Sequence, residues 1–224
     1  MSIKALFFDV GNTLLFPNRE KMLRALHERH IFPAPELLQK IERQTKREFD
    51  LLQEGDSVID HGFWRIFYSH LLEAVGLSDN DAICGTLVSC TRVSANWCEI
   101  RPHTKEVLTR LAGEYRLGVI SNADGKIAEV LNRCGIAGCF ESITDSGIVG
   151  KEKPHAAIFE AAVNSLGVAP EDSLYIGDVY SVDYLGATRF GMQAVLFDVA
   201  GAYKDKNLPR VESLEQLELL LRNT

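Results

Sequence analysis

Short apolar runs and amphipathic stretches alternate along most of the chain. Helical periodicity covers 105–115, 126–134, 156–166, 184–190 and, near the end, 214–221. Four apolar runs bounded by turn residues have the pattern of strands buried on both faces of a parallel sheet, at 3–8, 117–120, 173–176 and 194–197. Strands that alternate with single helices require right-handed crossovers, so the pattern predicts an α/β fold with a doubly wound parallel sheet.

The middle of the chain follows a different pattern. From about residue 17 to 96 apolar residues recur at helical spacing, without a convincing buried strand, and turn residues at 32–35, 54–56 and 76–79 separate the helices. We therefore expect an α-helical cap over 16–100, inserted into a core made of 1–15 and 101–224. Ligand sites of open parallel sheets lie beyond the carboxyl ends of the strands, so this insert is expected to cover the site as a lid. A helical subdomain that does not touch the substrate is the alternative.

Composition narrows the classes of function. The 224 residues are 46% hydrophobic and 25% charged, which is ordinary for a globular protein. The net charge of -7 argues against binding to nucleic acid or to an anionic membrane surface. The first apolar run is too short for a signal peptide or a membrane span, so we expect a cytoplasmic protein. Five cysteines without a CxxC pair indicate neither a disulfide framework nor a zinc site.

An aspartate ends the first apolar run. Asp9 follows three large apolar residues and precedes a glycine-containing turn. A carboxylate at this point is exposed at the carboxyl end of a strand, beside backbone N–H groups of residues 10–13 that could bind an anion. Asp9 is therefore a candidate nucleophile that takes up a phosphoryl group as an aspartyl-phosphate. An acid that merely starts a turn is the alternative.

Two further fragments lie at the same predicted edge of the sheet. Ser121 and Asn122 close the run at 117–120, where a hydroxyl and an amide could donate to phosphate oxygens. Lys153 precedes Pro154 at the start of a predicted helix, where an ammonium could hold the nucleophile and the phosphate together. Taken singly, each residue also fits a turn or a solvated loop.

A pair of acids follows another predicted strand. Asp178 comes after Gly177, and Asp183 is five residues further on. At that spacing both acids can serve one cation, Asp178 directly and Asp183 through a water or a hydrogen bond. Mg²⁺ is the natural choice because all the ligands would be oxygens. The alternative for one of the acids is an N-cap role.

Together these four fragments resemble the motifs of the haloacid dehalogenase-like (HAD) hydrolase superfamily, with a helical cap between the first and the second motif. The resemblance implies a Rossmann-like core, an Asp9 nucleophile, phosphate contacts from Ser121 and Lys153, and Mg²⁺ held by Asp9, the carbonyl of Gly11 and Asp178. The complete predicted sets are as follows: catalytic, Asp9, Ser121 and Lys153; phosphate-binding, Val10, Gly11, Asn12, Ser121, Asn122 and Lys153; metal-binding, Asp9, Gly11, Asp178 and Asp183.

The chain departs from this family's phosphatases at Gly11. They usually carry a second aspartate there, which protonates the leaving group and then activates water. General acid–base help of this kind is worth about 10² to 10⁴ in rate. A good leaving group, as in an acyl phosphate or a sugar 1-phosphate, could make the acid unnecessary. A water or a cap residue such as His61 or Arg65 could replace it, or the reaction is not phosphoryl transfer.

We therefore predict a Mg²⁺-dependent phosphatase for a small phosphorylated metabolite. The alternative is a 2-haloacid dehalogenase that uses Asp9 without a metal, although Asp178 and Asp183 favour a metal and hence a phosphate. A third reading is a catalytically silent binding protein of the same fold. The predicted partner is the metabolite, with no nucleic acid or membrane, and both a monomer and a homodimer are compatible with the sequence.

Overall fold

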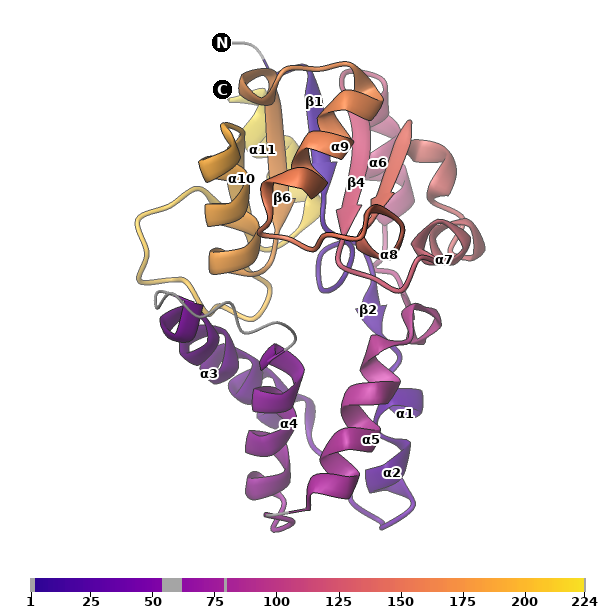
Figure 1. Cartoon of the computed structure of the whole chain (residues 1–224), viewed down its shortest axis with the longest axis vertical. Helices are drawn as coiled ribbons and strands as arrows, with labels where there is room; N and C mark the ends of the chain where they lie inside the picture. The colour runs from indigo at the N-terminus through magenta and orange to yellow at the C-terminus, as the bar shows by residue number, and fades with distance from the viewer. Residues whose placement is uncertain (1–2, 54–61, 79, 224) are drawn as a thin grey trace.

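The core of the protein is a six-stranded parallel sheet, as seen in a computed structural model that describes residues 3–53, 62–78 and 80–223. The strand order β5-β4-β1-β6-β7-β8 places the first strand in the middle (Figure 1). Every neighbouring pair in this sheet is parallel, which confirms the predicted α/β class. The strands are β1 (Ala5–Phe8), β4 (Arg116–Ser121), β5 (Ser142–Asp145), β6 (Ser173–Gly177), β7 (Gln193–Phe197) and β8 (Arg210–Val211).

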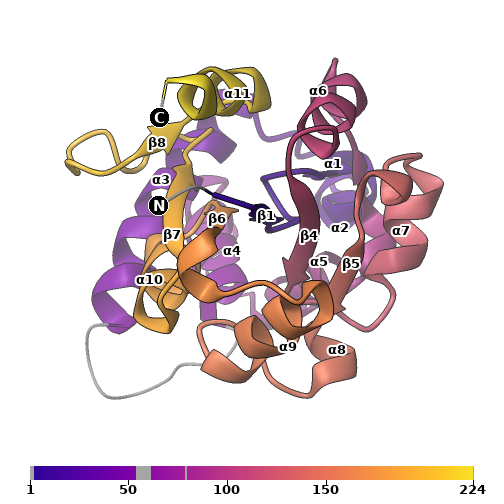
Figure 2. The ribbon, with the colours of Figure 1, turned by 90° about the horizontal axis from the view of Figure 1, so that it is seen from above.

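Helices cover both faces of the sheet. Side chains alternate along a strand, so Leu6 and Phe8 of β1 pack into one apolar cluster and Ala5 and Phe7 into another. Figure 2 shows the sheet between these two layers. On the Leu6 side lie α6 (Thr104–Ala112), α7 (Ile127–Arg133) and α11 (Leu214–Arg222); on the Phe7 side lie α9 (Ala156–Leu166) and α10 (Leu185–Phe190), with the short α8 (Ser146–Val149) preceding α9.

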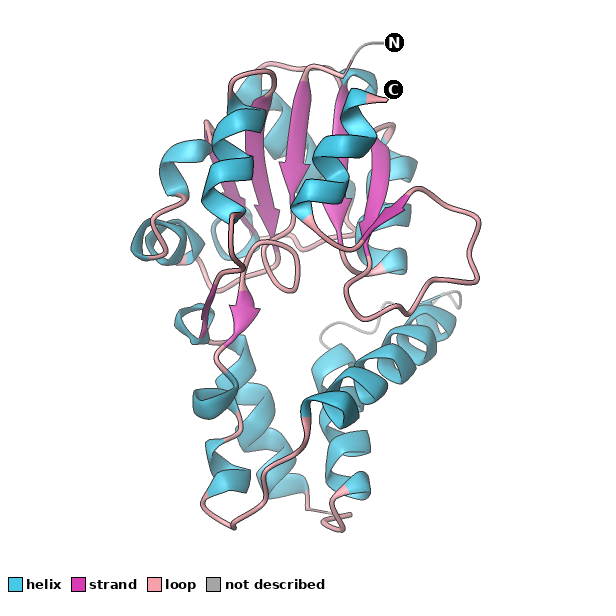
Figure 3. Cartoon of the chain, turned by 180° about the vertical axis from the view of Figure 1, so that it is seen from behind, coloured by secondary structure: helices cyan, strands magenta, loops and turns pink. Residues whose placement is uncertain are grey.

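A helical insert separates β1 from the rest of the sheet. Two short antiparallel strands, β2 (Phe16–Pro17) and β3 (Trp97–Glu99), carry the chain out to the insert and back (Figure 3). The insert has its own apolar cluster, which includes Leu26, Leu71 and Leu87, so it packs as a unit. Its helices are α1 (Arg19–Met22), α2 (Arg24–His27), α3 (Pro35–Gln53), α4 (Gly62–Ala74) and α5 (Asp81–Arg92).

Several local features differ from the sequence prediction. β5 and β8 were not predicted, because β5 is a polar strand at the sheet edge and β8 has two residues. The predicted helix at 184–190 is preceded by a π-helical turn at Tyr180–Tyr184, and α10 begins at Leu185. The five cysteines are free thiols. Among the described residues, no helix combines the length and the apolar character needed to span a bilayer.

Candidate active site

Three predicted site residues meet at the carboxyl edge of the sheet. Asp9 directly follows β1, Ser121 ends β4, and Asp178 follows β6. β1 lies between β4 and β6 with Phe8 paired to Val119 and to Ile176, so all three chain exits lie at one level. The backbone N–H of Asp9 donates to the carbonyl of Ile176 over 2.8 Å, which fixes the start of the turn.

A cluster of buried acids occupies this edge. Asp9, Asp178 and Asp183 each offer a carboxylate oxygen, and these oxygens lie within 4.8 Å of one another. Burial raises the pKa of Asp9 to about 7 against the opposing charge of Lys153, and the carboxylates of Asp183 and Asp178 add to the rise. Burial also raises the pKa of Asp178 to about 6 against the opposing charge of Lys46. The site therefore concentrates negative charge where water is scarce.

Lys153 lies inside this cluster. Its ammonium donates to Asp9 Oδ1 over 2.6 Å, to the hydroxyl of Tyr175 over 2.7 Å and to Asp183 Oδ1 over 2.9 Å. Burial disfavours the charged ammonium, but Asp183 and Asp9 outweigh this cost and raise the pKa of Lys153. Lys153 is therefore a permanent cation that orients Asp9, and the alternative of a solvated loop lysine is wrong.

Asn122 holds the backbone of Lys153. Its Oδ1 accepts the N–H of Lys153 over 2.7 Å, and its Nδ2 donates to the carbonyl of Lys153 over 3.0 Å. This pair of bonds ties the loop after β4 to the segment before α9. Asn122 thus positions Lys153, and its predicted contact with phosphate stays a prediction.

Gly177 lets Asp183 enter the cluster. A Cβ atom on Gly177 would lie 2.5 Å from Cγ of Asp183, a distance that no side chain tolerates. Asp183 is then held by three donors, because its Oδ2 accepts the N–H of Val179 over 2.9 Å while its Oδ1 accepts from Lys153 and Tyr175. An acid with both oxygens occupied suits the indirect role toward a cation that the sequence predicted.

The turn after Asp9 uses some of the backbone donors that were predicted to bind phosphate. Asn12 adopts a left-handed conformation, and its N–H donates to the carbonyl of Leu15 over 2.8 Å. The N–H of Thr13 donates to the carbonyl of Val10 over 3.3 Å. Within the described chain, the N–H groups of Val10 and Gly11 are not used by the turn. They are the backbone donors next to Asp9 that remain for an anion.

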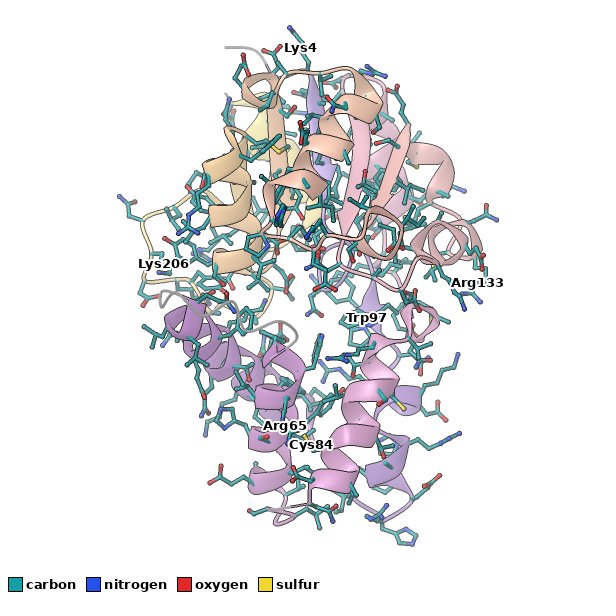
Figure 4. All side chains as sticks on the ribbon, viewed as in Figure 1. Lys4, Arg65, Cys84, Trp97, Arg133 and Lys206 are labelled. Atoms are coloured by element: carbon teal, nitrogen blue, oxygen red, sulfur yellow. The ribbon has the colours of Figure 1, made fainter. Side chains whose placement is uncertain are left out.

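An indole ring lies against Gly11. A Cβ atom on Gly11 would lie 3.4 Å from Cζ3 of Trp97, in van der Waals contact with the six-membered ring. Trp97 is 9% exposed and donates its Nε1–H to the carbonyl of Thr91 over 2.8 Å. In Figure 4 it lies where the helical insert meets the core. Gly11, where the family's phosphatases usually carry the second aspartate, is therefore bordered by the aromatic ring of Trp97.

Of the two cap residues considered as substitutes for that acid, Arg65 lies in the described part of the chain. The guanidinium of Arg65 pairs with Asp81 over 2.8 Å on the surface of the insert, with 62% of its side chain exposed. Figure 4 shows Arg65 on the part of the insert away from the sheet. The interpretation of Arg65 as a substitute acid is therefore wrong. His61 lies outside the described residues.

The helical insert supplies a residue that the sequence analysis missed. Lys46 of α3 is completely buried, with Nζ 2.8 Å from Oδ2 of Asp178 and 3.2 Å from Oε1 of Glu42. One turn further, Asp50 accepts the N–H of Ser181 over 3.0 Å. Glu42, Lys46 and Asp50 recur every four residues, and this was the available signal. A charged row at that spacing also fits a solvated helix face.

The donor set fits the predicted Mg²⁺. The clustered acids offer only oxygen ligands, which hard divalent cations prefer. When all are ionised, the carboxylates of Asp9, Asp178, Asp183 and Glu42 face the two ammonium groups of Lys46 and Lys153. The excess negative charge equals the charge of one divalent cation.

A cavity of about 310 Å³ opens between the insert and the core. This volume is within the range of small-molecule sites. It shares Asn12 with the turn after Asp9 and Glu42 with the contacts of Lys46. Its wall also includes Phe16, Arg19, Gln39 and Arg101.

Comparison with known proteins identifies relatives of this chain. The family model of haloacid dehalogenase-like hydrolases matches residues 3–191. A glyceraldehyde 3-phosphate phosphatase of Methanothermobacter thermautotrophicus is 31% identical over 198 residues, which are 87% of this chain and 85% of that protein. The 5-amino-6-(5-phospho-D-ribitylamino)uracil phosphatase YigB of Escherichia coli is 28% identical, over 94% of this chain and 92% of that protein.

Solved structures share the architecture. The HAD-hydrolase YfnB of Bacillus subtilis, bound to magnesium, superimposes with a TM-score of 0.68 at 19% identity and covers 99% of both chains. Haloacid dehalogenases match as well, at identities from 17% to 25%. The structural likeness establishes the fold, whereas the two sequence relatives described above carry the names of phosphatases.

Proposed function

The chain belongs to the haloacid dehalogenase-like hydrolase family, and on this premise we propose that it is a Mg²⁺-dependent phosphoric monoester hydrolase for a small phosphorylated metabolite. One observation carries the proposal: the ammonium of Lys153 holds Asp9 at 2.6 Å inside a cluster of acids that can bind a divalent cation. The phosphatase names of the sequence relatives support the same reaction class.

Asp9 is the nucleophile in this proposal. Its Oδ1 is engaged by Lys153, so its other oxygen attacks phosphorus. A bond forms between that oxygen and phosphorus while the bond from phosphorus to the leaving oxygen breaks, giving an aspartyl-phosphate. The N–H groups of Val10 and Gly11 and the hydroxyl of Ser121 donate to the phosphoryl oxygens. Water then attacks the phosphorus of the aspartyl-phosphate, and phosphate and the Asp9 carboxylate are released.

The proposed Mg²⁺ ligands are Asp9, Asp178 and the carbonyl of Gly11. When bound, the cation would neutralise charge on the phosphoryl oxygens. Lys153 and Tyr175 keep Asp183 beside these ligands, where it orients the cluster. This role agrees with an acid whose oxygens are already occupied.

The leaving group receives no proton from position 11, because glycine has no side chain to supply it. The atoms of Trp97 next to Gly11 are ring carbons, which cannot supply a proton either. We therefore propose substrates whose leaving groups depart as weak bases, such as acyl phosphates or sugar 1-phosphates. The cavity of about 310 Å³ beside Asn12 would hold the remainder of the substrate, with the helical insert as its lid.

A haloacid dehalogenase is the second candidate, because that reaction would use the same aspartate to displace halide from carbon. It needs no cation, so it gives no reason for a cluster of acids whose oxygens could bind one. Asp178 and Asp183 lie within 4.8 Å of Asp9. A surplus of negative charge around a nucleophile that attacks neutral carbon would have no use, so the phosphatase is favoured.

The test is phosphate release from a panel of small phosphorylated compounds that includes sugar 1-phosphates and acyl phosphates. Each reaction is run with Mg²⁺ and with a chelator, and Asp9→Asn is the control. Metal-dependent release that the variant loses supports the proposal. Halide release from 2-haloacids in the absence of Mg²⁺ would establish the dehalogenase. Mg²⁺-dependent stabilisation without turnover of any compound would identify a binding protein.

A further inference from the structure

Lys46 is a residue of the helical insert whose ammonium lies among acids of the core. Its side chain is 1% exposed, and its Nζ lies 2.8 Å from Asp178 and 3.2 Å from Glu42. Asp178 is a proposed Mg²⁺ ligand, so the insert places a cation beside a metal site. None of the steps of the proposed reaction involves Lys46.

Docking of α3 does not depend on this charge. Arg43 and Arg47 donate to the carbonyls of Ala200 and Ala202 over 3.1 Å each, and Asp50 accepts the N–H of Ser181. These bonds already fasten the helix to the loops after β6 and β7. Burying an ammonium is costly, and an apolar side chain of the same length would pack there without that cost. The position of Lys46 therefore calls for a role in the site itself.

The positive charge of Lys46 acts on both ligands of the proposed site. Lys46 cancels one of the negative charges that attract a divalent cation, so its ammonium repels Mg²⁺. The same charge attracts the phosphate dianion, which the clustered carboxylates otherwise repel. Lys153 cannot do this alone, because its three hydrogens are already directed at Asp9, Tyr175 and Asp183. Among the residues that the structure describes, the ammonium of Lys46 contacts two carboxylates, those of Asp178 and Glu42.

We propose that Lys46 is a positioning residue that docking of α3 delivers to the site, where its ammonium weakens Mg²⁺ binding and strengthens binding of the phosphate group. This inference rests on the proposed phosphatase function. It makes the insert a source of charge for the site in addition to a cover. The position of Lys46 therefore affects the binding of both ligands in opposite directions: Mg²⁺ binds better without a positive charge next to Asp178, and the phosphate group binds better with one.

The test compares two affinities in the full-length protein by isothermal titration calorimetry. Mg²⁺ is titrated alone, and inorganic phosphate is titrated at saturating Mg²⁺. In Lys46→Met we expect Mg²⁺ to bind about tenfold more tightly and phosphate about tenfold more weakly than in the wild type. Opposite shifts are the signature of charge, because a merely structural loss would move both affinities in the same direction.

Two further variants keep the test decisive. Arg43→Met removes a cation and a docking bond from the same helix, but its guanidinium contacts the carbonyl of Ala200 and none of the acids. It should leave the Mg²⁺ affinity unchanged. Glu42→Gln removes the carboxylate that neutralises Lys46, so it should weaken Mg²⁺ and strengthen phosphate, the reverse of Lys46→Met. If circular dichroism shows that Lys46→Met is unfolded, the Mg²⁺ and phosphate affinities of Glu42→Gln test the proposal instead.

Wild-type affinities in both Lys46→Met and Glu42→Gln would overturn the inference, as would shifts of both ligands in the same direction. These outcomes differ from failure of the proposed function. A wild-type protein that binds neither Mg²⁺ nor phosphate and releases none from the panel of phosphorylated compounds refutes the phosphatase, and the inference with it. A wild-type protein that releases phosphate while Lys46→Met behaves as Arg43→Met refutes only the role of Lys46.

Discussion

The ammonium nitrogen of Lys153 lies 2.6 Å from Oδ1 of Asp9, and both side chains are almost completely removed from water. Breaking a buried ion pair leaves the remaining charge uncompensated. In Lys153→Met we therefore expect the free energy of unfolding at pH 8 to fall by about 3–5 kcal/mol. Phosphate release should fall by about 10² to 10³, since a donor to the reacting group is lost.

Urea unfolding at pH 8 and at pH 5 checks the cause of this loss. The pKa of Asp9 is about 7, so at pH 5 its carboxyl is largely protonated and tolerates removal of the ammonium better. The destabilisation should be smaller at pH 5. Lys151→Met, at an exposed position two residues away, is the matched control and should change neither stability nor turnover. Equal destabilisation at the two pH values would contradict this account.

The pH dependence of stability follows from the same carboxyl. The pKa of Asp9 is raised from 3.8 to about 7, mainly by burial, so between these values the folded protein binds more protons than the unfolded chain. The stabilising effect of protonation is complete below about pH 4 and is lost as the pH rises through about 7. Asp9→Asn removes this titration. The metal-free variant should therefore gain stability over the metal-free wild type as the pH rises, by a few kcal/mol at pH 8.

Thermal unfolding of both proteins in chelator, from pH 4 to pH 8, measures that difference. Adding Mg²⁺ to the wild type should oppose the loss, because a cation bound to the ionised carboxylates stabilises the charged form. A difference between wild type and variant that does not change with pH would show that Asp9 does not titrate in this range.

Restoring an acid at position 11 should change the preference for leaving groups. In Gly11→Asp the new Cβ atom would lie in ordinary contact with Trp97, so the backbone can accept the side chain. We expect release from alkyl phosphates to rise by about 10² or more. Release from acyl phosphates should change little, because those leaving groups need no proton. Gly11→Asn, which has the same shape without the acid, is the control, and an equal gain in both variants would refute proton donation.

The contact between Gly177 and Asp183 predicts a cost for a single methyl group. In Gly177→Ala the new Cβ atom would clash with Asp183, and overpacking of this kind costs about 1–3 kcal/mol. Gly85 lies inside α5, where an added Cβ atom would meet nothing within 4 Å beyond its own turn of the helix, so Gly85→Ala should stabilise the protein by about 0.5–1 kcal/mol. Urea unfolding compares the two. Mg²⁺ affinity should fall only in Gly177→Ala.

Much of the site could be predicted from the sequence because its parts follow strands. Asp9, Ser121 and Asp178 each come directly after or at the end of an apolar run, and parallel strands carry their carboxyl ends to one edge. The position of each residue at the end of an apolar run was therefore enough to predict that residues far apart in the sequence lie together at one edge of the sheet. Tyr175 was missed for a related reason, since a tyrosine inside an apolar strand has the pattern of core, and the partners of its hydroxyl, Lys153, Asp183 and the carbonyl of Ile120, come from other segments of the chain.

The contribution of α3 could not be read in the same way. Lys46 and Arg47 are neighbours in a charged helix, yet one is completely buried and the other is exposed. Their difference depends on where the loops after β6 and β7 lie, and the hydrogen bonds of α3 with these loops span 131 to 160 residues of sequence. Periodicity shows which residues share a helix face, but it does not show what that face meets.

The central position of β1 has a consequence for synthesis on the ribosome. β1 precedes both of its neighbours, which begin at Arg116 (β4) and Ser173 (β6), so its hydrogen bonds to them form only after the helical insert has been translated. The apolar cluster of the helical insert uses residues between 23 and 88 and can form in this interval. The insert can therefore acquire its apolar core while β1 is still an unpaired, wholly apolar strand, and the sheet closes around β1 only afterwards.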